Sequence, residues 1–150
     1  MRIGSVLRHG AALSIVAFLV HGAWEYAQCS RFFFHGSVPP TALGMLQATV
    51  GDVGLTWVAQ LTGAVAFRDW WWWSTAARLR SGLLLVGVAI ILALAFEAHA
   101  LRTGRWAYRP EAPLIPGTPI SLLPVAQLVL LFPFSFWAAA RIEGTPPQDG

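Results

Sequence analysis

Four long apolar segments, separated by short polar breaks, limit what this chain can fold into. They cover residues 10–28, 41–67, 82–101 and 120–140. Each reaches the ~20 residues that a helix needs to cross about 30 Å of hydrocarbon. The chain is 56% hydrophobic and only 11% charged, whereas soluble domains carry about 25% charged residues. We therefore expect an all-α membrane protein, a single domain over residues 1–150 with four transmembrane helices in an up-down bundle with short loops.

The distribution of arginines predicts the orientation of this bundle. Four arginines lie in the two loops that would share one side, at Arg31, Arg102, Arg105 and Arg109. Six lie on the side of the termini, at Arg2, Arg8, Arg68, Arg78, Arg80 and Arg141. Because cytoplasmic loops carry the excess of basic residues, we predict an integral, multi-pass membrane protein with both termini in the cytoplasm. The arginines flank spans, so we expect contacts with membrane lipids and not with nucleic acid.

Three of the seven acidic residues, Glu25, Asp52 and Glu97, lie inside the apolar spans. An ionised carboxylate there costs several kcal/mol unless it is paired, hydrated or protonated, so each is a candidate functional residue. When the spans are centred on the membrane, these acids and Gln127 fall in one layer, within about 9 Å of the midplane on the outer side. Groups that only join helices would scatter in depth. The layer therefore predicts one shared pocket, although Gln127 alone is also typical of a helix clasp.

His21 and Glu25 are four residues apart and share one helix face. This pair is compatible with a proton relay, with part of a metal site, or with a polar clasp between helices. Together with Asp52 and Glu97 it offers mixed nitrogen and oxygen ligands, but no tight ligand spacing supports a metal. We therefore predict no cofactor, and a metal held by these four residues stays a secondary interpretation.

The second span carries a polar stripe within about 80° of its helical wheel, which predicts a face turned toward protein. Its members are Thr49, Asp52, Thr56, Gln60 and Gly63. Hydroxyls and amides at this spacing commonly bond across helices, so helix packing accounts for most of the stripe. Asp52, near the middle of the span, is the candidate catalytic residue, and Thr56 is a candidate ligand contact.

A basic and aromatic loop follows the third span and is expected to cover the acidic layer. Its candidate ligand-binding residues are Arg105, Trp106 and Tyr108. Such a cover suits a hydrophobic or amphiphilic small molecule with an anionic or polar head. The alternative for Glu97 is an ion pair with Arg105 at the outer interface. His99 lies about 200° from Glu97 around the helix, so the two are not expected to act as a pair.

Four consecutive tryptophans, Trp70 to Trp73, lie between the second and third spans with arginines on both sides. Indoles prefer the level of the lipid headgroups. The run therefore predicts an interfacial anchor or a short surface helix, with ligand stacking as the alternative.

The segment EAHALRTGRWAYRPEAPLIPGTPISLLP, which begins at Glu97, carries an acid, a Gly-aromatic-Tyr cluster and a Pro/Gly loop. It resembles the corresponding segment of membrane carotenoid hydratases and related cyclases, over about 30 residues. Those enzymes protonate an isoprenoid double bond with a membrane-buried acid, and the resemblance implies that role for Glu97. A similarity to four-helix sterol isomerases is architectural only.

Three functions are compatible with these residues. The first is an enzyme that modifies a lipid or isoprenoid, with Asp52 or Glu97 as general acid, His21 with Glu25 as base, and Arg105 orienting a polar head. The second is a binding, assembly or accessory protein without turnover. The third is a proton or cation transporter, which would have to form a homo-oligomer. A cavity that reaches all three acids would favour the enzyme over a packed scaffold.

Overall fold

The computed structural model describes residues 3–34 and 41–144, and most of them are helical. Within this part of the chain, four helices are long and apolar enough to cross a membrane. This confirms the predicted all-α membrane bundle. A short additional helix, α3, lies between the second and third spans. The helices are α1 (Ile3–Phe32), α2 (Ala42–Phe67), α3 (Trp72–Thr75), α4 (Arg78–Thr103) and α5 (Leu122–Glu143).

The helix ends lie close to the predicted ends of the spans and follow local capping chemistry. Thr41 and Ser121 precede α2 and α5, and their side-chain oxygens accept hydrogen bonds from amides of the first turn, as N-caps do. α4 is followed by Gly104 in the left-handed conformation, with φ of 66°, where glycine avoids the Cβ penalty. α1 has 30 residues and extends past both predicted ends of the first span.

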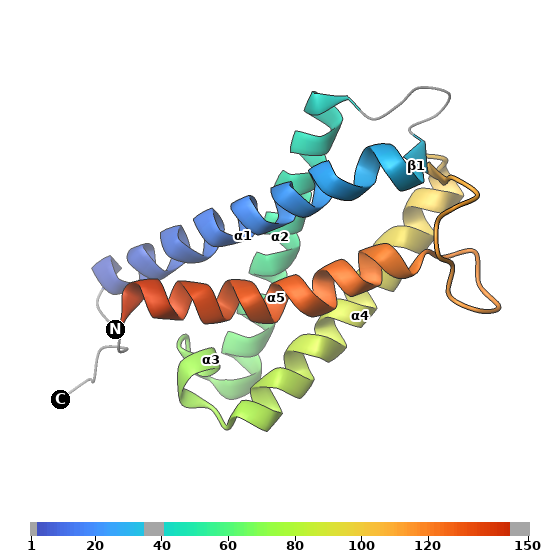
Figure 1. The fold of residues 1–150 in the computed structure, drawn as a ribbon. Coiled ribbons are helices and arrows are strands. Elements are labelled where there is room, and N and C mark those ends of the chain that lie inside the picture. Colours follow the sequence, from blue (N-terminus) through green and yellow to red (C-terminus); the bar gives the residue numbers. More distant parts are fainter. Residues whose placement is uncertain (1–2, 35–40, 145–150) are drawn as a thin grey trace.

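Two short strands lie at the end of the bundle opposite the start of α1 and the end of α5 (Figure 1). β1 (Phe33–Phe34) pairs antiparallel with β2 (Ala107–Tyr108). Beyond this pair, the amide of Arg109 donates to the carbonyl of Phe32 at 2.9 Å. These bonds fasten the loop after α4 onto the end of α1. Such pairing joins segments far apart in the chain, and no local sequence signal marks it.

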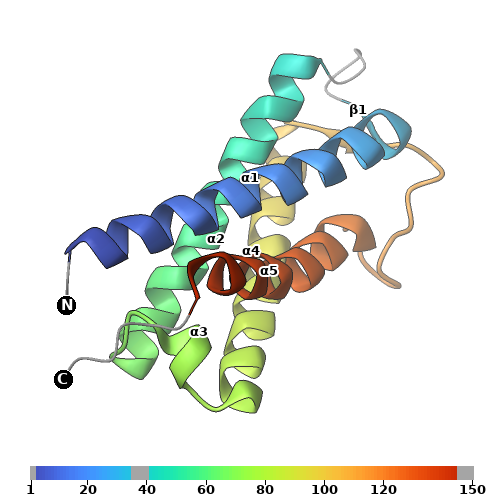
Figure 2. The same cartoon turned by 60° about the vertical axis from the view of Figure 1, so that its left-hand side comes forward.

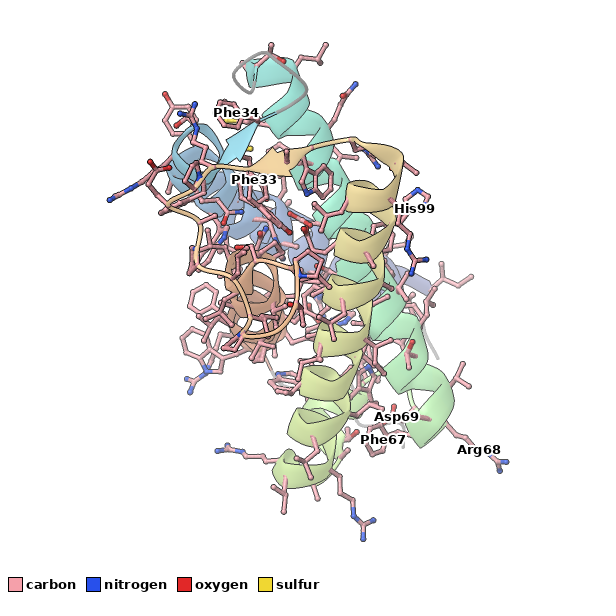
Figure 3. The ribbon with its side chains drawn as sticks, turned by 90° about the vertical axis from the view of Figure 1, so that its right-hand side faces the viewer. Phe33, Phe34, Phe67, Arg68, Asp69 and His99 are labelled. Carbon is pink, nitrogen blue, oxygen red and sulfur yellow. The ribbon has the colours of Figure 1, made fainter. Side chains whose placement is uncertain are left out.

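The four long helices do not pack equally tightly around the bundle. α1 and α5 run antiparallel side by side, α5 also packs along α4, and α1 crosses α2 (Figure 1, Figure 2). By contrast, α2 crosses α4 (Figure 3), and the two helices separate toward the end that carries β1 (Figure 1). An apolar core closes the end near α3, and its largest fully buried side chains are Leu13, Trp72, Leu85, Phe132 and Phe136.

The tryptophan run turns into the bundle at α3. Trp72 is fully buried, its ring is stacked on Phe67 with centroids 5.7 Å apart, and its Nε1 donates to Gln60 Oε1 at 3.1 Å. Gly63 makes room for the indole, because a Cβ there would lie 2.1 Å from a ring atom. The predicted interfacial anchor is therefore wrong for Trp72. Its indole tolerates burial because the N–H has a hydrogen-bond partner.

Candidate functional site

A cluster of polar side chains from α1, α2 and α5 forms the centre of the candidate site. Gln127 Nε2 lies 2.7 Å from Asp52 Oδ2, 3.1 Å from Glu25 Oε1 and 3.2 Å from His21 Nδ1. Three of these side chains are buried, and that of Asp52 is 16% exposed. His21 and Glu25 share one face of α1 because they are one helical turn apart. The structure thus joins these members of the predicted layer by direct hydrogen bonds.

The cluster offers Gln127 more acceptors than its amide can serve. The amide nitrogen has two hydrogens but three neighbouring atoms that could accept them, so it cannot donate to all three. His21 Nδ1 also lies 3.5 Å from Asp52 Oδ2. A hydrogen on Nδ1, directed at Asp52, leaves both amide hydrogens for the two carboxyl groups. His21 Nε2 is buried and has no hydrogen-bond partner among the described residues.

Gln28, one turn beyond Glu25 on α1, extends the cluster. Its Nε2 donates to Gln127 Oε1 at 3.1 Å and to Glu25 Oε1 at 3.4 Å. Its Oε1 is buried without a hydrogen-bond partner in the described part of the chain. Cys29 is buried next to it, and its thiol hydrogen-bonds to Glu25. Neither Gln28 nor Cys29 was a predicted site residue, although the position of Gln28 on the stripe of His21 and Glu25 was a usable signal.

Glu97 connects α4 to the loop that carries β2. Its Oε2 accepts hydrogen bonds from Trp106 Nε1, at 3.2 Å, and from the hydroxyl of Tyr108. Burial and the hydrogen bond to Glu97 raise the pKa of Tyr108, so the phenol keeps its proton and acts as a donor. The guanidinium of Arg105 lies 5.5 Å from the centroid of the Trp106 ring. The alternative of a Glu97–Arg105 ion pair is wrong, since no such pair occurs among the described residues.

A cavity of about 190 Å³ is lined by residues of α1, α2, α4 and α5 and lies toward the end where α2 and α4 separate in Figure 1. Residues at its rim, including Gly51 and Phe96, are also exposed on the surface. The cavity therefore opens between two membrane-spanning helices. Its volume suits a head group and a few carbons, because pockets for drug-sized ligands have about 300–1,000 Å³. The inner polar part of its wall is formed by Glu25, Gln28, Asp52, Glu97 and Gln127, and Gln47 and Arg105 are exposed at its rim.

Some predicted site residues do not reach this cavity. Arg105 and Trp106 line it, whereas His21, Thr56 and Tyr108 lie outside its wall. The hydroxyl of Thr56 donates to a backbone carbonyl of α2 at 2.9 Å, a bond within its own helix. His99 is exposed on the outside of α4 (Figure 3), as the helical phase predicted. The site is therefore built around the acids and the two glutamines.

Comparisons of the chain with family models, curated proteins and solved structures find no significant match. The resemblance to carotenoid hydratases stays a prediction from one segment. Among the described residues, no group of three or more His, Cys, Asp or Glu side chains is placed to hold a metal ion. A metal held by His21, Glu25, Asp52 and Glu97 thus gains no support from the site geometry. Fold and site together define a four-helix membrane protein with an acidic cavity between its helices.

Proposed function

We propose that the protein binds a lipid or isoprenoid through the opening between α2 and α4 and modifies it by acid–base chemistry. One observation carries this proposal. Glu25, Asp52 and Glu97, from three different helices, line a single cavity. Carboxyl groups that only join helices need no cavity, whereas a binding or catalytic site does.

Asp52 is the proposed proton donor to a double bond of the bound molecule. Its side chain lines the cavity, while its Oδ2 accepts from Gln127 and faces His21. A carboxylic acid placed within reach of the reacting carbon can transfer its proton to a double bond. Glu25 would accept a proton from the adjacent carbon, so the two transfers balance and the double bond shifts. Glu97 is the alternative acid of the same cavity, and its Oε2 accepts two hydrogen bonds from the loop.

A binding protein without turnover is the second candidate, and one observation favours it. The amide of Gln127 donates to both Glu25 and Asp52, as a clasp between helices would. A transporter, alone or as a homo-oligomer, receives less support. Four spans without an inverted repeat are few for a complete transporter, which would have to form a homo-oligomer.

The protein is a membrane protein by the length and composition of its helices. We further propose that both termini face the cytoplasm. The support is the arginine distribution, with six arginines on the side of the termini and four on the other.

We expect the purified protein to carry a bound lipid whose amount depends on Gly51. Gly51 lines the cavity, and a Cβ built there meets no atom within 4 Å. Gly51→Leu should therefore fill the opening without disturbing the helix. Mass spectrometry of copurifying lipids should show at least an approximately fivefold loss, because a filled opening excludes the ligand.

Gly54→Leu is the matched control for this measurement. Gly54 lies on the same helix and is equally open at its Cβ position, but it is not part of the cavity wall. It should retain the lipid content of the wild type. Equal lipid contents in the two variants would contradict the proposed function.

A further inference from the structure

The buried polar wall of the cavity has no amide or ring hydrogen left for a ligand. Three glutamines line the cavity, and one of them, Gln47, is exposed at the rim. Each of the two buried ones has two amide hydrogens. Those of Gln28 are directed at Gln127 and Glu25, and those of Gln127 at Glu25 and Asp52. Trp106 Nε1, also in the wall, donates to Glu97. Within the described residues, these buried donors are therefore all engaged.

Hydrogen-bond acceptors, by contrast, are left over in the same wall. The side chain of Gln28 lines the cavity, the residue is only 6% exposed, and its Oε1 has no partner in the described part of the chain. A buried acceptor without a partner is costly, and a donor from a ligand would remove that cost. The carboxyl groups of Glu25 and Asp52 also have more lone pairs than Gln127 can occupy. A proton on Asp52 would add one donor, which the proposed reaction directs at the double bond.

We propose that the cavity selects a lipid-soluble molecule whose head group donates hydrogen bonds, either a hydroxyl or a protonated amine. This inference rests on the proposed function and names the class of ligand for the same cavity. A carboxylate or phosphate would place its oxygens against Gln28 Oε1 and the carboxyl groups, where no buried N–H faces them. Arg105, the cation among the lining residues, is exposed at the rim. The anionic head that the sequence left open is therefore disfavoured.

The rest of the wall supports an apolar tail on this ligand. Leu55, Ala93, Phe96 and Leu128 line the cavity beside its polar part. Because the volume is only about 190 Å³, the tail would continue through the opening between α2 and α4. Its surroundings there are lipid, which accepts a hydrocarbon chain without cost.

Four compounds with the same tail and different head groups test the proposal: farnesol, farnesylamine, farnesyl methyl ether and farnesoic acid. Binding to the full-length protein in detergent is measured as the shift in melting temperature over a series of ligand concentrations. We expect the alcohol and the amine to bind at concentrations about tenfold below those of the ether and the acid.

Gln28→Met is the informative variant, because methionine keeps the side-chain length and removes the amide oxygen. It should reduce the preference for the alcohol over the ether. The comparison is made within each variant, so a general loss of stability cancels. Wild-type protein that binds the ether as tightly as the alcohol, prefers the acid, or binds none of the four overturns the inference.

The proposed function and this inference fail in different ways. Preference for the acid overturns the donor head group and leaves a lipid-binding cavity in place. Equal copurifying lipid in Gly51→Leu and Gly54→Leu, described above, overturns the lipid-binding function itself. A preference for the alcohol and the amine without any turnover supports the inference and overturns only the catalytic part of the proposal.

Discussion

Gln127 is the residue through which three helices exchange hydrogen bonds in the site. Its amide donates to Glu25 of α1 and to Asp52 of α2, and it accepts from Gln28. An amide suits this position because it supplies donors to two carboxyl groups that have no arginine within ion-pair distance among the described residues. Its depth beside the acids is predictable from the sequence. Its contacts are not, because they depend on how α5 packs against α1 and α2.

At the same scale, we predict that Asp52→Asn abolishes turnover while the bound lipid stays. Asparagine keeps the size of the side chain but has no acidic proton to give. The measurement is mass spectrometry of lipids from membranes with the wild type or the variant, comparing substrate and product. A loss of product of at least about a hundredfold is expected for a removed general acid.

Glu111→Gln is the control for this loss, since Glu111 is exposed on the loop after α4. It should leave the product profile unchanged. An unchanged product profile in Asp52→Asn would exclude Asp52 as the acid and favour the binding protein without turnover.

The inner face of α2 both lines the cavity and packs against α3. Toward one end it carries Asp52 at the cavity, and toward the other it carries Gln60 and Gly63 against Trp72 of α3. The polar stripe of this helix was predictable, since helical phase alone places its members on one face. The contact of Gly63 with Trp72 was not predictable, because it depends on how the segment after α2 folds back against that helix.

For this element, we predict that Gly63→Ala lowers the free energy of unfolding by about 1–3 kcal/mol, the usual cost of overpacking. The added Cβ would lie 2.1 Å from Trp72, a fully buried ring that cannot move aside. Thermal unfolding in detergent, followed by tryptophan fluorescence, measures the effect.

Gly54→Ala provides the comparison, because a Cβ at Gly54 meets nothing within 4 Å. It should be neutral or stabilising by up to about 1 kcal/mol, since alanine favours the helix over glycine. Similar melting temperatures for the two variants would show that Trp72 does not pack against Gly63 as described.

The whole molecule is closed at one end and open at the other. At the end of the termini, His9 Nδ1 and Glu143 Oε1 lie 2.8 Å apart, each side chain 7% exposed, and join the start of α1 to the end of α5. The His9 ring lies against Trp71, with centroids 4.9 Å apart. At the other end α2 and α4 diverge (Figure 1). This asymmetry places the cavity in the half of the molecule that carries β1 and β2.

The arginine distribution predicts how the whole molecule is oriented in the membrane, with both termini in the cytoplasm. Two variants carry a single cysteine in a protein whose native cysteine is removed by Cys29→Ser. The Glu111→Cys variant should react with a membrane-impermeant maleimide in intact cells. The Ser74→Cys variant, with its cysteine on α3, should react only after lysis. Both positions are exposed, so the difference reports sidedness. The reverse pattern would place the termini outside the cell.

Local patterns in the sequence determined the class of the protein and the parts of its site. Segment length and hydropathy set the four spans, because a helix must be long and apolar enough to cross the bilayer. The cost of a carboxylate in hydrocarbon identified Glu25, Asp52 and Glu97, and all three line the cavity. Helical phase also separated His99 from Glu97, as observed.

Tertiary structure alone decided which of these residues meet. It bonded Glu97 to Trp106 and Tyr108, buried Trp72, and opened the cavity between α2 and α4. The reason is physical. Hydropathy and phase fix the inward face of a single helix, whereas distances between helices depend on side-chain volumes from segments far apart in the chain. The sequence therefore determined that acids lie within the bundle, and packing decided that they share one cavity.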